Sequence, residues 1–164
     1  MSDPFSNMIE IERAMLDFRN NHLDSYVRSG GAEGHILDMR DAGGHRLTTT
    51  LLLRTVGAKS GQERLSPLIY GDIGGEVAVV ASKGGNDANP GWVHNIRAGG
   101  PVAFQIATQA FMATWREAEG AERDRIWDFM VQVFPPYAEY QTKTERLIPV
   151  FLLSALEDIP AFKG

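Results

Sequence analysis

The chain has 164 residues, 43% of them hydrophobic, and this length predicts one soluble domain with a core of ordinary size. Its formal net charge is −5, whereas a nucleic-acid-binding face normally carries an excess of Lys and Arg, so that class of function is not indicated. The chain contains no cysteine, which excludes disulfides and thiolate chemistry, and no apolar run approaches the ~18 residues of a membrane span.

Residues 1–31 are predicted to form an N-terminal helical segment. Asp3-Pro4 is typical of a helix start, a break is expected near Asn20-Asn21, and Gly30-Gly31 predicts the end. We expect this helix to pack against the rest of the chain. The alternatives are that it covers the mouth of a binding pocket or touches a membrane surface, but its mixed charges do not favour anionic lipid. The apolar positions at helical spacing are Met8, Ile11, Met15 and Phe18.

Residues 32–164 are predicted to form a small barrel in which short strands alternate with tight turns. Pro67 interrupts one expected strand and cannot donate a ladder hydrogen bond, which predicts an edge or a bulge there. This pattern indicates an α+β domain with about six mainly antiparallel strands and flanking helices. The expected strands are 35–40, 46–56, 64–70, 76–82, 102–106, 110–115 and 147–153.

Two helices are predicted among these strands. Asn89 is expected to cap the first, with Pro90 at its first helical position and an end near residue 99. The second spans 121–134 and is stopped by two prolines. Tyr137 and Tyr140 follow, and they share a face if a helical turn resumes.

Two glycine-rich loops carry the main functional signal, because each follows an apolar strand and contains a lysine and a serine. The first includes Gly57, Lys59 and Ser60, and the second spans 82–85. Glycine lets the backbone approach a ligand closely, and successive backbone N–H groups can bind an anion. With Arg64 close by, the loops predict a site for a phosphate- or carboxylate-bearing ligand. The alternative for either loop alone is an ordinary turn.

Other chemistries find little support in the sequence. The four histidines show no metal-ligand spacing, so no metal site is predicted. Ser60 and Ser82 have no identifiable histidine partner, which disfavours a hydrolase. We expect a cytoplasmic protein, with association at a membrane surface as the alternative.

Several motifs, taken together and in order, resemble the deazaflavin-dependent nitroreductase family over roughly Leu47 to Phe151. The family is a set of split β-barrels, similar to the FMN-binding and pyridoxine-phosphate oxidase barrels. The resemblance implies an oxidoreductase in which reduced coenzyme F420 delivers hydride to a quinone, a nitroaromatic compound or a similar small-molecule acceptor. The motifs are Thr55–Gly61 with Arg64 and Pro67, Ala81–Gly85, Asn89–Trp92 with His94-Asn95, Phe134–Gln141 and Arg146–Pro149.

The resemblance also implies roles for individual residues. Ser82, Tyr137 and Tyr140 are the candidates for catalysis, through a hydrogen bond near the ring edge and through orienting or protonating the acceptor. In one departure from the family, Ala58 stands where arginine is frequent, which removes a bidentate anion contact. In another, Phe134 stands where some members have tyrosine. The candidates for coenzyme binding are Lys59, Ser60, Arg64, Pro67, Ile69, Val80, Ala81, Ser82, Lys83, Gly84, Gly91, Trp92, Asn95 and Tyr137.

Two other functions stay open. FMN could replace F420, because Lys59 and Arg64 would serve its phosphate equally well. A non-catalytic carrier of the coenzyme or of a lipid-like ligand would bind tightly without turnover. The partners expected are therefore small molecules, with a homo-oligomer as a further expectation.

Overall fold

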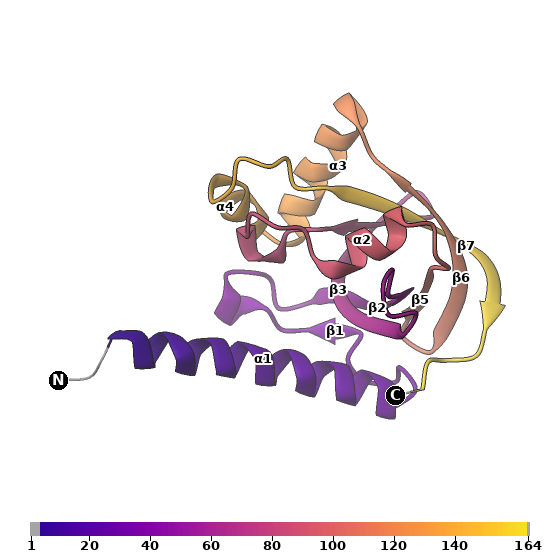
Figure 1. Cartoon of the computed structure of the whole chain (residues 1–164), viewed down its shortest axis with the longest axis horizontal. Coiled ribbons are helices and arrows are strands. Elements are labelled where there is room, and N and C mark those ends of the chain that lie inside the picture. Colours follow the sequence, from indigo (N-terminus) through magenta and orange to yellow (C-terminus); the bar gives the residue numbers. More distant parts are fainter. Residues whose placement is uncertain (1–3, 164) are drawn as a thin grey trace.

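The computed structural model describes residues 4–163, with side chains from residue 16 onward. Seven strands lie within these residues, and six of them close into an antiparallel barrel in the order β2-β3-β4-β7-β6-β5, where β5 pairs back with β2 (Figure 1). The short strand β1 (Ile36–Leu37) extends the sheet beside β2. The predicted α+β split barrel of about six antiparallel strands is confirmed. The barrel strands are β2 (Thr48–Val56), β3 (Glu63–Ile73), β4 (Glu76–Val80), β5 (Ala103–Ile106), β6 (Gln109–Glu117) and β7 (Val150–Ile159).

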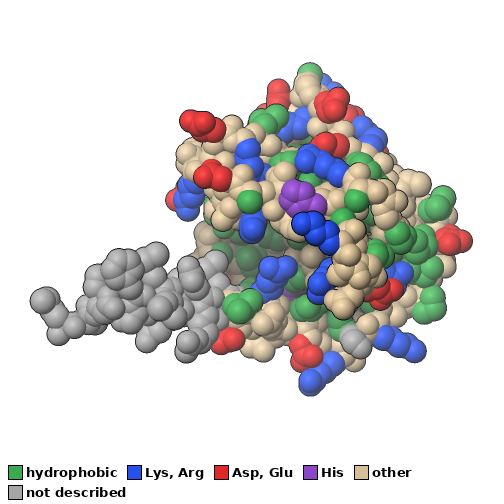
Figure 2. All heavy atoms as spheres, viewed as in Figure 1, with side chains coloured by type: hydrophobic (Ala, Val, Ile, Leu, Met, Phe, Trp, Pro, Cys, Tyr) green, Lys and Arg blue, Asp and Glu red, His purple; other side chains and the backbone are tan. Residues whose placement is uncertain are grey.

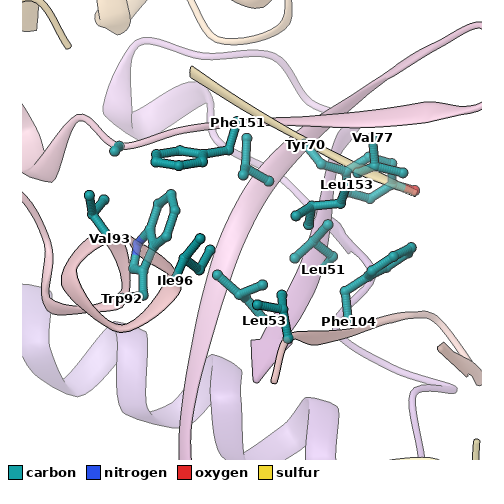
Figure 3. Packing of buried hydrophobic residues seen from close by; sticks show 13 residues of the cluster. Leu51, Leu53, Tyr70, Val77, Trp92, Val93, Ile96, Phe104, Phe151 and Leu153 are labelled. Carbon is teal, nitrogen blue, oxygen red and sulfur yellow. The ribbon is translucent and has the colours of Figure 1, made fainter. Parts of the chain in front are cut away.

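The barrel interior is filled by alternate residues of its strands. Leu51 and Leu53 on β2 point inward, where they join Phe104 and Phe151 in one core cluster (Figure 3). Leu52, between them, points outward and is also fully buried, because the helix α1 (Pro4–Arg28) covers it. Successive side chains of a strand face opposite sides, so a strand buried on both faces reads as a continuous apolar run.

A second core cluster lies outside the barrel, under the helices α3 (Gly120–Val133) and α4 (Pro136–Thr142). Val80 and Leu152 supply the outer faces of β4 and β7 to this cluster, and Met130 of α3 is fully buried against them. Strands β4 and β7 therefore separate the apolar cluster inside the barrel from the one under α3 and α4. This arrangement fixes α4 beside the segment that follows β4.

The last turns of α1 attach the N-terminal helix to the barrel. Tyr26 is fully buried; its hydroxyl donates to the Thr50 carbonyl at 3.0 Å and accepts from the Ala107 N–H at 2.9 Å. The helix runs unbroken through residues 20 and 21, where a break was expected, and its first half extends beyond the barrel (Figure 1). Of the predicted apolar stripe, Phe18 is 53% exposed, and the other three side chains lie outside the described residues.

The predicted glycine stop after α1 is confirmed. Gly30 and Gly31 both have positive φ, and the Gly31 N–H donates to the Tyr26 carbonyl at 2.9 Å. A Cβ at Gly31 would lie 1.7 Å from the Ala107 carbonyl oxygen, so only glycine fits between the helix end and the β5–β6 turn.

Several predicted boundaries are wrong; β3 and β4, for example, end at Ile73 and Val80 and not at residues 70 and 82. The strand expected at 35–40 is reduced to β1, because Asp38 accepts hydrogen bonds from the backbone and side chain of Arg40 and favours the 3₁₀ turn Arg40–Ala42. The last strand begins at Val150, not at residue 147, and continues to Ile159 along β6. Helix α2 (Gly91–Arg97) begins one residue after Pro90, and Asn89 does not cap it.

Pro67 lies at a partial edge, as predicted. Residues 63–69 of β3 pair only with β2, and residues 70–73 pair with β4. The register passes Leu52↔Pro67 without a shift, so the proline occupies a half-open part of the strand rather than a bulge.

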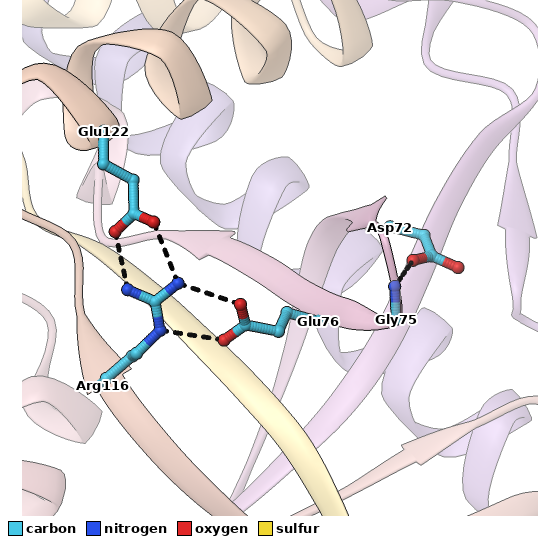
Figure 4. Close-up of polar contacts among 5 residues, drawn as sticks. All are labelled: Asp72, Gly75, Glu76, Arg116 and Glu122. Carbon is cyan, nitrogen blue, oxygen red and sulfur yellow. Dashed lines mark hydrogen bonds and ion pairs between the residues drawn. The ribbon is translucent and has the colours of Figure 1, made fainter.

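An ionic cluster joins β4, β6 and α3 on the side of the barrel. The Arg116 guanidinium donates to both oxygens of Glu76, at 2.9 and 2.9 Å, and to both oxygens of Glu122, at 2.6 and 3.1 Å (Figure 4). These hydrogen bonds lower the pKa of Glu76 and of Glu122 below their ordinary value of 4.5.

We predict that Arg116→Gln makes the stability of the protein less dependent on pH in the acid range. Carboxylates with a lowered folded pKa stabilise the fold above their unfolded pKa of 4.5, and this contribution is lost as pH falls through the lower folded values. Urea midpoints measured from about pH 7 down to about pH 3 test this prediction. The two curves should converge at the acid end, and parallel curves would show that the cluster contributes nothing.

Two properties bear on function. No helix within residues 4–163 is long and apolar enough to cross a membrane. In the part of the chain with described side chains, no group of three or more His, Cys, Asp or Glu residues could hold a metal ion.

Candidate functional site

A cavity of about 800 Å³ lies where the two lysine loops meet, between the β2–β3 loop, the segment after β4, helix α2 and helix α1. Figure 2 shows a hollow above the N-terminal helix, with Lys and Arg side chains around it. A volume of this size is typical of a cofactor site. The lining residues are Arg19, Gly57, Ala58, Lys59, Ser60, Arg64, Leu65, Ser66, Lys83, Pro90, Gly91, Trp92, His94 and Asn95.

The charge of the cavity opposes that of the chain. Four of the described lining residues are cations, namely Arg19, Lys59, Arg64 and Lys83, and none of the lining residues is Asp or Glu. The whole chain carries −5. Cations gathered without carboxylates create a locally positive potential, which favours an anionic ligand.

The first loop is held from within and from α2. The Gly57 N–H donates to the Gln62 carbonyl at 2.8 Å, and the Gln62 N–H donates to the Ser60 hydroxyl at 3.2 Å. Asn95 of α2 accepts from the Ala58 N–H at 3.0 Å through its side-chain oxygen and donates to the Thr55 hydroxyl at 3.1 Å. Asn95 therefore positions the loop that carries Lys59.

The second loop has an unusual backbone. Lys83, Gly84 and Gly85 all have positive φ, at 45°, 62° and 85°. A lysine in this region is strained, and such strain persists only where the surroundings hold it. One such constraint is α4, because a Cβ at Gly85 would lie 2.6 Å from the Tyr140 carbonyl oxygen.

Arg146 is a second constraint on this loop. Its guanidinium donates to the carbonyls of Ala81, Ser82 and Asn86 and to the side-chain oxygen of Asn89, at 2.8 to 3.3 Å. In the described part of the chain no ion pair includes Arg146. Desolvation by burial lowers the pKa of this guanidinium. The residue joins the segment before β7 to the segment after β4.

The structure brings half of the predicted coenzyme-binding residues into the cavity. The buried Trp92 packs edge-on against Phe151, with ring centroids 5.4 Å apart. The predicted residues that line the cavity are Lys59, Ser60, Arg64, Lys83, Gly91, Trp92 and Asn95. Those that lie outside its lining are Pro67, Ile69, Val80, Ala81, Ser82, Gly84 and Tyr137.

Most of the residues outside the lining belong to one of three places: the strained loop, the barrel core and the second core cluster. Ser82 and Gly84 belong to the strained loop, and Ala81 is fully buried in the barrel core. Ile69, Val80 and Tyr137 belong to the second core cluster, which Tyr140 borders.

The two predicted catalytic tyrosines lie in an aromatic group with Phe134. The rings of Tyr137 and Phe134 meet edge to face at 5.1 Å, and those of Tyr137 and Tyr140 at 6.2 Å. Desolvation by burial raises the pKa of Tyr137. It also raises the pKa of Tyr140, which is less completely buried. A phenol is protonated at neutral pH even at its ordinary pKa of 10.0, so both hydroxyls can donate a hydrogen bond.

Seven lining residues are absent from the predicted coenzyme-binding set. Six of them lie within two residues of a member of that set, namely Gly57, Ala58, Leu65, Ser66, Pro90 and His94. Arg19 comes from the N-terminal helix, more than thirty residues from any other lining residue, and no local pattern marks it.

Another hollow, of about 370 Å³, lies around Arg116. Its lining includes Asp72, Glu76 and Glu122, and Arg116 is already paired with both glutamates. Because its lining has three carboxylates against the two guanidiniums of Arg116 and Arg125, it is less suited to an anionic ligand than the cavity of the lysine loops.

A closed split barrel with a cationic, carboxylate-free cavity between two glycine-rich loops defines the class of protein: a barrel suited to an anionic coenzyme. A family model described as F420H(2)-dependent quinone reductase matches residues 19–155. The chain belongs to this family. The expected family of deazaflavin-dependent oxidoreductases, with F420 as the coenzyme, is thereby confirmed.

Individual relatives agree with the family assignment. An F420H(2)-dependent quinone reductase of Mycobacterium tuberculosis is 36% identical over 117 residues, covering 68% of this chain and 78% of that protein. A solved F420-H2 dependent reductase, FDR-A, is 46% identical with a TM-score of 0.59, covering 64% of this chain and 93% of that one. Another structure, described as a domain-swapped dimer, is 38% identical with a TM-score of 0.62, covering 85% of this chain and 98% of that one.

Proposed function

We propose that this protein reduces a quinone-type acceptor with reduced F420 bound in the cavity of the lysine loops. The observation that carries the proposal is the charge of that cavity: four cations and no carboxylate among its described lining residues. F420 bears a phosphate and glutamate carboxylates, so its charge is complementary. When bound, the reduced deazaflavin supplies a hydride; the protein supplies binding, orientation and exclusion of water.

Each part of the site has a role in this proposal. Lys59, Arg64 and Lys83 would bind the phosphate and the carboxylates, and Trp92 would pack beside the ring system. The loop of Ser82 and Gly84 would lie along the ring edge, where the Ser82 hydroxyl would offer a hydrogen bond. Pro67 and Ile69, and the backbone of Val80 and Ala81, would border the ring from the barrel side.

The acceptor binds next to the aromatic group at α4. Tyr137 and Tyr140, whose phenols are protonated at neutral pH, orient the acceptor and donate a hydrogen bond to its carbonyl oxygen. A flat, apolar acceptor such as a quinone suits an aromatic wall. Nitroaromatic compounds share this shape and are the alternative acceptors.

The test is a fluorescence titration of the purified protein with F420 and, separately, with FMN. We expect micromolar binding of F420, on the order of −8 kcal/mol, and much weaker binding of FMN. A menaquinone turnover assay then separates an enzyme from a carrier, which would bind F420 without acceptor-dependent oxidation. Preferential binding of FMN would keep the fold and overturn the assigned coenzyme.

We also propose that the chain forms a homo-oligomer. The neighbour described as a domain-swapped dimer and the part of α1 that extends beyond the barrel both support this (Figure 1). Light scattering at several protein concentrations would show a monomer if the proposal is wrong.

A further inference from the structure

We infer that Arg19, on the N-terminal helix, determines specificity in the coenzyme site. Its guanidinium binds the anionic tail of F420 and not the ring. This inference rests on the proposed function and extends the site to an element that none of the sequence motifs includes. Arg19 lines the same cavity as Lys59, Arg64 and Lys83.

The packing of α1 explains why Arg19 faces the cavity. Leu23, Tyr26 and Val27 lie in the core cluster beneath the helix, and Tyr26 is fixed by hydrogen bonds from its buried hydroxyl. Positions 19, 23 and 26 are four and three residues apart, so they share one face of the helix. The turns that are anchored to the barrel therefore present Arg19 at the cavity about two turns further along.

The guanidinium of Arg19 has no partner among the residues that the structure describes. No ion pair or hydrogen bond joins its guanidinium to another described residue, whereas Arg28, nine positions later, is paired with Asp24 at 3.1 Å. Holding a fourth cation beside three others is unfavourable in the absence of an anion. An arginine placed there gains by binding a phosphate or a carboxylate, which its planar fork fits bidentately.

The tail is the part of the coenzyme that Arg19 can reach to advantage. Arg19 of α1 is exposed, whereas Trp92, which lines the cavity from α2, is buried. In the first loop Ala58 precedes Lys59, so this loop has one cation, Lys59, and the next cation along the chain is Arg64. Arg19 adds a bidentate donor from the opposite element.

The test compares Arg19→Ala, Arg19→Lys and the parent protein in fluorescence titrations. The ligands are F420 with one glutamate, F420 with several glutamates, and the tail-free deazaflavin riboside. We expect Arg19→Ala to weaken F420 binding by about 5- to 10-fold and to leave binding of the tail-free compound unchanged. Arg19→Lys should fall between the two, because it keeps the charge and loses the fork. If the loss of affinity in Arg19→Ala grows with the number of glutamates, Arg19 binds the tail carboxylates. If the loss is the same for F420 with one and with several glutamates, Arg19 binds the phosphate.

The control is Arg28→Ala, which removes the same charge from the same helix outside the cavity and should leave affinity unchanged. The melting temperature of Arg19→Ala should not fall, because removing a cation from this cluster relieves repulsion. Equal losses for F420 and the tail-free compound, or no loss relative to Arg28→Ala, would overturn the inference. Failure of the parent to bind F420 would instead overturn the proposed function.

Discussion

Replacing Lys59 and Arg64 together by alanine will weaken F420 binding by roughly 100-fold. Both side chains are exposed at the cavity, and each offers a charge-assisted hydrogen bond worth about 1.5 kcal/mol, or about tenfold in affinity. Each single variant should lose about tenfold, provided the two contacts act independently. The measurement is the F420 titration at constant ionic strength, since screening weakens exposed charges.

The matched control for this pair is Arg125→Ala with Lys163→Ala. These exposed cations line other hollows, and their removal changes the net charge by the same amount. The control should bind F420 almost normally. If both double variants lost affinity equally, the general charge of the protein would account for binding, and the assigned site would be wrong. Melting temperatures should barely differ, because neither pair is buried.

Replacing Arg146 by alanine will weaken F420 binding by roughly 30-fold and lower the free energy of unfolding by about 2 kcal/mol. The guanidinium donates to four acceptors on the segment from Ala81 to Asn89, and its loss leaves three carbonyls without these donors. The strained backbone at Lys83 then loses a constraint that holds it. Urea unfolding and the F420 titration measure the two effects.

The Arg146→Lys variant distinguishes the effect of the Arg146 hydrogen bonds from the effect of its charge. A lysine keeps the positive charge near the loop but has a single nitrogen, which cannot reach acceptors spread from Ala81 to Asn89. We expect it to behave like the alanine variant. Full recovery by lysine would mean that Arg146 acts by attracting the anion and not by positioning the loop.

Much of the fold could be predicted because the relevant signals are local. The apolar run at Leu51–Leu53 and the turns rich in glycine predicted barrel strands. Pro67 predicted an edge or a bulge, and the structure shows an edge at that part of β3. Boundaries were wrong where a tertiary contact or a local side-chain bond competes with propensity. Asparagine is a favoured helix cap, for example, yet the side-chain oxygen of Asn89 accepts a hydrogen bond from Arg146 and does not cap α2.

The sequence by itself determined the barrel strands and the two lysine loops, because alternation, turn chemistry and spacing act between residues close together in the chain. The coenzyme class followed from the resemblance of ordered motifs to a known family. Only the tertiary structure decided that Arg19 of α1 joins Lys59 and Lys83 in one cavity, and that Arg146 and Asn95 hold its loops. Such contacts join residues up to sixty-five positions apart, and their partners are mostly backbone groups, which every residue possesses and no sequence pattern distinguishes.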